Sequence, residues 1–107
     1  PGIMVAAEAL FMKASKLPRV EIFDPPDSVI GKGTNSALKA GIIYGYAGLV
    51  EGMVKRMKVE MEEAPLVIAT GGLAPLMGQA ATCIDAVEAD LTLEGLRIIA
   101  AELTAAE

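Results

Sequence analysis

The chain has 107 residues and a mass of 11.1 kDa, which is the size of a single domain. Apolar residues make up 53% and charged residues 21%, a composition that excludes a disordered segment and favours a folded domain with a core. The net charge of −5 has the wrong sign for a domain that binds nucleic acid through its phosphates, and the absence of histidine excludes imidazole metal ligands and Ser-His or Cys-His nucleophile pairs.

The composition also predicts what fills the core. Aromatic residues are only 4%, so Ala, Leu, Ile, Val and Met must fill it, and backbones must approach closely. The single Cys83 excludes an internal disulfide and favours a reducing cytoplasm, with the thiol buried and inert. The longest apolar stretch, Ala40 to Val50, is too short for a membrane helix, which needs about 20 residues.

The first predicted elements are a helix and an extended segment. Helical spacing predicts a helix from Ile3 to Leu17, closed by Pro18. The alternating run from Val20 to Ile22 is either a brief edge strand or an extended loop, because the two prolines that follow cannot continue a central strand.

A glycine loop and a long helix come next. The loop from Ile30 to Thr34 contains glycines that permit positive φ, and Thr34 is the predicted N-cap of a helix that runs to about Glu62. An apolar stripe on this helix consists of Leu38, Ile42, Leu49, Met53 and Met57. A second stripe has no side chains and consists of Gly41, Gly45, Gly48 and Gly52. Either another helix, subunit or sheet lies close to this face, or the helix is broken near Gly45.

The remaining sequence alternates strands and helices, which indicates an α/β fold. Leu66 to Ala69 is predicted to be a buried parallel strand, followed by a glycine turn and a helix. A second extended run near Ile84 to Val87 leads to Thr92, the predicted cap of a final helix with an apolar stripe of Leu93, Leu96, Ala100 and Leu103.

Two loops are candidate binding sites. The turn at Thr70, Gly71 and Gly72 follows a strand and opens a helix, where backbone N–H groups can contact a nucleotide, although such turns are also common as plain connections. The loop from Gly31 to Thr34 suits a carboxylate or phosphate, or is an ordinary N-cap beside a solvated lysine. The carboxylates form no clear catalytic pair, and we expect no metal site, including at Asp85, Glu88 and Asp90.

Several segments in collinear order resemble the C-terminal domain of type III pantothenate kinases, also known as Bvg accessory factor homologues. The most specific are the Ile-Gly-x-x-Thr, Ala-Thr-Gly-Gly-Leu-Ala and Leu-Thr-Leu-Glu-Gly-Leu pieces, which begin at Ile30, Ala69 and Leu91. The resemblance covers essentially the whole chain, residues 1–107.

The resemblance implies an actin-like, ribonuclease-H-like fold of two related α/β domains with ATP between them. This chain would be the helix-rich C-terminal domain with an incomplete sheet. The family transfers a phosphoryl group from ATP to pantothenate in coenzyme A synthesis, with Mg²⁺ and a monovalent cation, K⁺ or NH₄⁺. Thr34 matches a threonine that contacts pantothenate across a homodimer interface, and Thr70, Gly71 and Gly72 match a turn on the nucleotide side. The glycine stripe would then lie in or near the dimer contact.

The family's phosphate loops, cation ligand and catalytic Asp base have no counterpart here, and the resemblance places all of them before Pro1. We therefore expect a C-terminal piece of a longer enzyme, with no signal peptide, that is inactive alone and exposes a sheet edge and an apolar helix face. Two alternatives stay open: a non-catalytic dimerisation or regulatory module, and a sugar or acetate kinase of the same fold.

Overall fold

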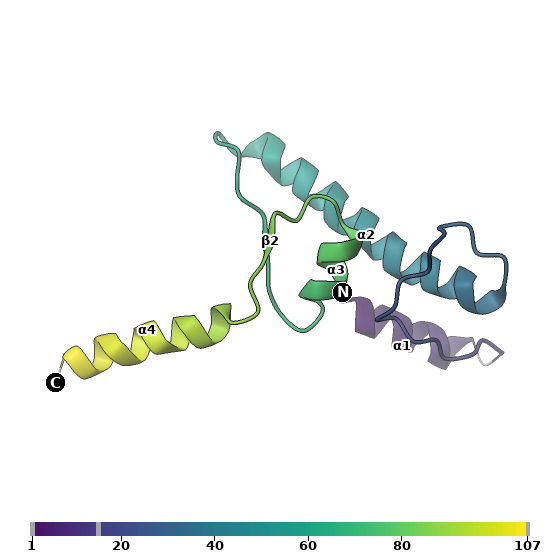
Figure 1. Cartoon of the computed structure of the whole chain (residues 1–107), viewed down its shortest axis with the longest axis horizontal. Coiled ribbons are helices and arrows are strands. Elements are labelled where there is room, and N and C mark those ends of the chain that lie inside the picture. The colour runs from purple at the N-terminus through teal and green to yellow at the C-terminus, as the bar shows by residue number, and fades with distance from the viewer. Residues whose placement is uncertain (1, 15, 107) are drawn as a thin grey trace.

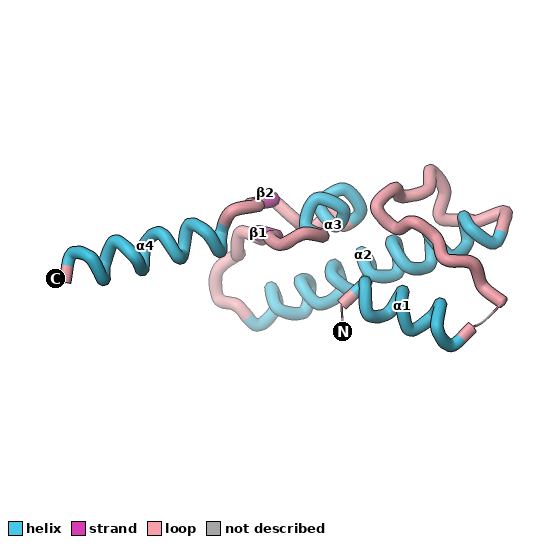
Figure 2. Tube along the Cα trace, turned by 90° about the horizontal axis from the view of Figure 1, so that it is seen from below, coloured by secondary structure: helices cyan, strands magenta, loops and turns pink. Residues whose placement is uncertain are grey.

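The computed structural model describes residues 2–14 and 16–106. The elements in chain order are α1 (Ile3–Lys13), α2 (Thr34–Glu60), β1 (Ile68–Ala69), α3 (Ala74–Ala80), β2 (Ala86–Val87) and α4 (Leu91–Ala105). The molecule is elongated, with extents of 60 × 33 × 23 Å, and Figure 1 shows α2 as its spine and α4 projecting from one end. In Figure 2, α1 and α3 lie against α2, whereas α4 extends away from the other helices.

The first helix, α1, is shorter than the predicted range of Ile3 to Leu17. It ends at Lys13, because Ala14 leaves the helical region with φ −110° and ψ 82°. Leu17 instead donates its N–H to the Ala14 carbonyl at 3.0 Å, in a turn, and the proline after Leu17 disfavours the helical conformation at this residue. Ser15, which belongs to the predicted helix, lies outside the described residues.

The segment from Val20 to Ile22 is an extended loop, so the strand alternative is wrong. Neither of the paired strands includes it. Its alternating pattern still has a structural consequence, since Ile22 is buried and Glu21 is exposed. The alternation of apolar and polar residues therefore indicated which side chain is buried, and it did not indicate pairing in a sheet.

The long helix α2 has 27 residues without interruption, so the alternative of a break near Gly45 is wrong. Its C-terminal residue, Glu60, lies close to the predicted end at Glu62. The face formed by Gly41, Gly45, Gly48 and Gly52 is exposed, and a Cβ added at any of the four would meet no atom within 4 Å. The close approach predicted for this face is therefore not made within the described part of the chain.

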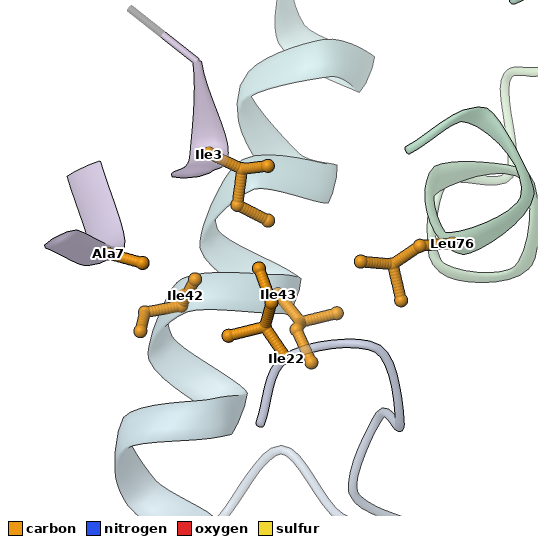
Figure 3. Close-up of a cluster of buried hydrophobic side chains, with 6 residues drawn as sticks. All are labelled: Ile3, Ala7, Ile22, Ile42, Ile43 and Leu76. Atoms are coloured by element: carbon orange, nitrogen blue, oxygen red, sulfur yellow. The ribbon is translucent and has the colours of Figure 1, made fainter. Parts of the chain in front are cut away.

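The core lies where α1, the 20–22 loop and α3 meet the middle of α2. Figure 3 shows six buried side chains pointing toward one another from these segments: Ile3, Ala7, Ile22, Ile42, Ile43 and Leu76. Ile43 is completely inaccessible at its centre, and further alanines of α2 and α3 are buried beside it. The buried hydrophobic residues are all Ala, Ile or Leu, as the composition predicted, while Phe11 and Tyr46 pack partly buried against this cluster.

The sheet consists of β1 and β2, which pair in parallel with Ile68 opposite Ala86 and Ala69 opposite Val87. Helix α3 packs on one face of it, so closely that a Cβ added to Gly78 would lie 2.7 Å from Val87 Cγ2. The opposite face is open, and Ile68 is 45% exposed. The parallel pairing was predicted correctly, but the expected burial of the first strand is wrong because no layer covers its second face within the described residues.

The last helix, α4, begins after Asp90, so the prediction of Thr92 as its N-cap is wrong. None of its 15 residues is buried, and it makes no contact with another helix or strand of the described chain. Its predicted stripe is therefore exposed at Leu93, Leu96, Ala100 and Leu103.

Two smaller sequence expectations concern Cys83 and membranes. Cys83 is half-buried rather than buried, and lines a hollow beside α2 with Glu51 and Lys55. Among the helices of the described residues, none combines the length and the apolar character needed to cross a bilayer.

Candidate functional site

The start of α2 is built by two glycines and a serine. Gly33 is the N-cap, in an extended conformation with φ −134°, so Thr34 is the first helical residue rather than the cap. Ser36 Oγ accepts a hydrogen bond from the Gly33 N–H at 3.1 Å and donates one to the Gly33 carbonyl at 3.1 Å. The hydrogen bond from the N-cap N–H to the side chain of the third helical residue is one half of a capping box. The exposed Thr34 hydroxyl is therefore not used to cap the helix.

The approach to this helix start is fixed by close packing at Gly31. A Cβ at this position would lie 2.4 Å from both the backbone N and the Cα of Ala37, which leaves no room for a side chain. The predicted reason for the glycines here was positive φ, and this is wrong, since Gly71 is the described glycine that has it. At Gly31 the requirement is space between the loop and the first turn of α2.

A polar hollow of about 570 Å³ lies beside the first turns of α2. Asn35, Ser36 and Lys39 line it from the helix, and the segment that follows α1 forms the other wall. The cations facing the hollow are Arg19 and Lys39, and the carboxylates are Glu21, Asp24 and Asp27. Thr34 precedes Asn35 in the chain but does not itself line the hollow.

Two contacts hold the opposite wall of this hollow in place. The Tyr44 hydroxyl donates a hydrogen bond to the Pro26 carbonyl at 2.5 Å, which ties the proline segment to α2. Arg19 pairs with Glu8 at 2.5 Å, and its guanidinium lies 5.7 Å from the centre of the Phe11 ring. The hydrogen bond and charge of Glu8 raise the pKa of Arg19. Arg19 is thus paired with residues of α1. Lys39 is the cation that lines the hollow from α2.

The turn between β1 and α3 has the geometry that its glycines predict. Gly71 adopts φ 99°, a conformation that other residues rarely take, and its carbonyl accepts the Ala74 N–H at 3.1 Å. Leu73 is the N-cap of α3, and a proline follows in the first turn of the helix. Thr70, Gly71 and Gly72 are all exposed, so their backbone is accessible to a ligand.

The two predicted sites do not meet within this chain. Figures 1 and 2 place the N-terminal end of α2 and the β1–α3 turn in different parts of the molecule, and α2 makes no contact with β1. Thr34 and the turn of Gly71 and Gly72 are therefore separate surfaces, each of which would form only part of a site.

The acidic residues near the second strand have structural roles. The Asp85 carboxylate accepts a hydrogen bond from the Val67 N–H at 2.8 Å, and the Asp85 N–H bonds to the Val67 carbonyl at 2.8 Å, so the two segments are joined just before the paired strands. Asp90 is the N-cap of α4, and its carbonyl accepts the Glu94 N–H at 2.8 Å. Within residues 2–14 and 16–106, no group of three His, Cys, Asp or Glu side chains is placed to hold a metal ion.

Two features of the site were missed in the sequence. Lys39 lies one helical turn after Asn35, and this spacing could have placed it at the same hollow. Glu51 accepts hydrogen bonds from the Thr82 N–H at 2.7 Å and the Thr82 hydroxyl at 3.0 Å, which lower its pKa. No local pattern indicates this contact, because 31 residues separate its partners.

Comparison with known proteins decides the family. The family model described as type III pantothenate kinase matches residues 1–56, which include α1, the loop of Gly31 and all of α2 except its last turn. The chain belongs to the type III pantothenate kinase family. The match contains the motif at Ile30, and the family resemblance seen in the sequence is confirmed.

Individual members of the type III pantothenate kinase family are similar along nearly the whole chain. The protein of that name from Desulfatibacillum aliphaticivorans is 64% identical over 99 residues, which are 92% of this chain and 38% of that protein. The one from Desulforapulum autotrophicum is 63% identical over 100 residues, 94% of this chain and 38% of the relative. The one from Bacillus cytotoxicus is 57% identical over 99 residues. The chain thus spans less than two-fifths of the length of these curated relatives.

Proposed function

We propose that the chain is the C-terminal domain of an enzyme that phosphorylates pantothenate with ATP. The observation that carries this proposal is the family match together with 64% identity to a type III pantothenate kinase over 92% of the chain. Such enzymes work mainly by positioning and by stabilising charge on the transferred phosphoryl group. This chain contributes to the positioning of the substrates. It supplies a substrate contact, a nucleotide-facing turn and a surface for a second subunit.

Thr34 is the substrate contact in this proposal. Its hydroxyl is exposed at the first residue of α2, and Ser36 rather than Thr34 caps the helix. The Gly31 packing and the Ser36 hydrogen bonds fix the backbone beside it, so the hydroxyl is presented from a rigid support. It would donate or accept a hydrogen bond to pantothenate in the pocket of the partner subunit, which is consistent with its distance from the β1–α3 turn of its own chain.

The turn of Thr70, Gly71 and Gly72 is the nucleotide contact. Support comes from its exposed backbone, and from the positive φ of Gly71 and the absence of side chains there, which let a ligand approach the peptide groups. The described residues contain no cluster of metal ligands, so the groups that hold Mg²⁺ and the monovalent cation K⁺ or NH₄⁺ would come from the rest of the polypeptide. The catalytic base would likewise come from the rest of the polypeptide.

The exposed surfaces fit a domain that is completed by the rest of the enzyme. The proposed actin-like fold requires a larger sheet, and the described part of the chain has two strands whose outer edges are unpaired. The open glycine face of α2 suits a homodimer contact, since small residues let two helices approach closely. A non-catalytic dimerisation module would share these surfaces but would not need Thr34.

A chimera tests the proposal. Replacing the matching 99 residues of the Desulfatibacillum aliphaticivorans enzyme with this chain should preserve ATP-dependent phosphorylation of pantothenate, whereas this chain alone should show no turnover. A chimera that folds and binds ATP but does not phosphorylate pantothenate would contradict the proposal. Phosphorylation of a sugar or acetate instead would favour a different kinase of the same fold.

Thr34→Ala in this chimera tests the substrate contact. Loss of one substrate hydrogen bond, about 1 kcal/mol, should raise the KM for pantothenate by about five- to tenfold and leave the KM for ATP nearly unchanged. Thr104→Ala, on the exposed α4, is the matched control and should change neither constant. An unchanged KM for pantothenate would remove Thr34 from the site.

A further inference from the structure

Gly33, the residue directly before Thr34, is held at both of its polar backbone groups by one side chain. Ser36 Oγ accepts a hydrogen bond from the Gly33 N–H and donates one to the Gly33 carbonyl, each at 3.1 Å. The Gly33 carbonyl also accepts the Ala37 N–H at 2.9 Å. The peptide groups on both sides of Gly33 are therefore fixed, and the second of them is the group that joins Gly33 to Thr34.

The position of Gly33 depends on these hydrogen bonds, because nothing else restrains it. A glycine has no Cβ and can adopt many backbone conformations. In the structure Gly33 is extended, with φ −134° and ψ 169°, a conformation open to any residue. A Cβ added there would meet Ser36 Oγ at 3.8 Å, which is an ordinary contact distance, so close packing does not hold this residue either.

Ser36 and Thr34 divide two tasks at the start of α2. An N-cap serine or threonine commonly uses its own hydroxyl to bond the backbone of the first turn. Here the N-cap is Gly33, which has no hydroxyl, and Ser36 supplies the hydrogen bonds from inside the helix. Thr34 is exposed at the first helical residue, and its hydroxyl stays available to a ligand.

We propose that Ser36 is a positioning residue for pantothenate, which acts through Gly33 on the hydroxyl of Thr34. The inference rests on the proposed function of Thr34 as the substrate contact. Without the Ser36 hydroxyl, Gly33 exchanges among several conformations, and Thr34 presents its hydroxyl in the binding geometry for only part of the time. The apparent affinity for the substrate then falls in proportion to that fraction. Ser36 itself needs no contact with pantothenate.

Kinetics of the chimera with the Desulfatibacillum aliphaticivorans enzyme test this role. Ser36→Ala should raise the KM for pantothenate by about two- to fivefold, which corresponds to a binding-competent fraction of about one-half to one-fifth. The KM for ATP should stay unchanged. A serine with only a structural role would instead alter the amount of folded enzyme, which lowers kcat and leaves both KM values as they are. Ser36→Thr keeps a hydroxyl at this position and should restore most of the affinity for pantothenate.

Ser28→Ala is the matched control. Ser28 Oγ accepts the Ile30 N–H at 3.2 Å, so this serine makes the same kind of local hydrogen bond in the segment that leads to α2. Its bond does not involve the residue that precedes Thr34. Ser28→Ala should therefore change neither KM value, and an increase equal to that of Ser36→Ala would overturn the proposal.

A double-mutant cycle shows whether Ser36 acts through Thr34. In a Thr34→Ala background, Ser36→Ala should raise the KM for pantothenate no further, because the hydroxyl that it positions is already gone. A full additional increase would overturn the proposal, and so would an unchanged KM in Ser36→Ala alone.

The same measurements separate this inference from the proposed function. If Thr34→Ala raises the KM for pantothenate and Ser36→Ala does not, only the role of Ser36 is wrong. If the chimera does not phosphorylate pantothenate, or if Thr34→Ala leaves its KM unchanged, the proposed function or its substrate contact is wrong, and the role of Ser36 is overturned with it.

Discussion

The body formed by α1, α2 and α3 contrasts with the arm formed by α4. Both have helical sequences with apolar stripes, but Ile43 of the body is completely buried and no residue of the arm is. The difference does not come from local composition, since α4 is as rich in Leu and Ile as the buried part of α2. An apolar stripe shows that a helix needs a partner, and it does not show whether the partner belongs to the same chain.

The largest expected effect of this contrast is on the stability of the core. Ile43→Ala removes a side chain that packs between α1, the 20–22 loop and α3, so unfolding by urea should show a loss of about 2 to 4 kcal/mol. Ile99→Ala, on the exposed arm, is the matched substitution and should change stability by less than about 0.5 kcal/mol in the monomer. Similar losses in both variants would mean that α4 is as buried in solution as the body.

A smaller effect distinguishes a glycine that is needed for close packing from a glycine that faces open space. Gly31→Ala forces a Cβ against the backbone of Ala37 and should cost about 1 to 3 kcal/mol. Gly48→Ala should instead stabilise the isolated chain by up to about 1 kcal/mol, because this helical glycine faces open space. Thermal unfolding of the two variants measures whether each substitution lowers or raises the stability of the chain. Destabilisation by Gly48→Ala would mean that another surface already lies against the glycine face.

The smallest effect concerns pH and the contact between α2 and the α3–β2 loop. The Thr82 N–H, and then its hydroxyl, hold the pKa of Glu51 below its usual value. A lowered carboxylate pKa stabilises the fold above the unfolded pKa, and this contribution is lost as pH falls through the folded value. The midpoint of thermal unfolding of the chain should therefore fall on acidification, and it should fall less in Glu51→Gln.

Glu94 provides the matched control, because Arg97 lowers its pKa through a contact within the arm. Glu94→Gln should leave the stability of the body unaffected. An equal pH dependence in Glu51→Gln and the parent chain would contradict this role.

Local patterns predicted the elements of the fold better than their ends. The long helix, the parallel strands and the glycine turn were predicted from periodicity and turn residues, and the structure confirms them. The N-caps at Thr34 and Thr92 were placed one or two residues too late, because Gly33 and Asp90 take these positions. Many residues tolerate the cap geometry, so the neighbouring backbone decides between adjacent candidates.

The two candidate loops could be named from the sequence, but the hollow and its Lys39 could not. The loops of Gly31 and Gly71 carry recognisable local chemistry, so their sequence marks them as candidates. The hollow beside Asn35 and Lys39 depends on a segment held by Tyr44 and Pro26, which are 18 residues apart. Such contacts leave no periodic signal, because each uses only one residue from each segment.

The sequence by itself determined the helical and extended segments, a core centred on Ala, Ile and Leu, and the family, because these follow from local conformational preference, hydrophobic spacing and collinear motifs. The tertiary structure decided which apolar stripes are buried and which stay open. It also decided that Thr34 and the turn of Gly71 lie on separate surfaces. The physical reason is that burial depends on contacts between distant segments, and a stripe on α4 has the same pattern whether its partner is in the same chain or in another.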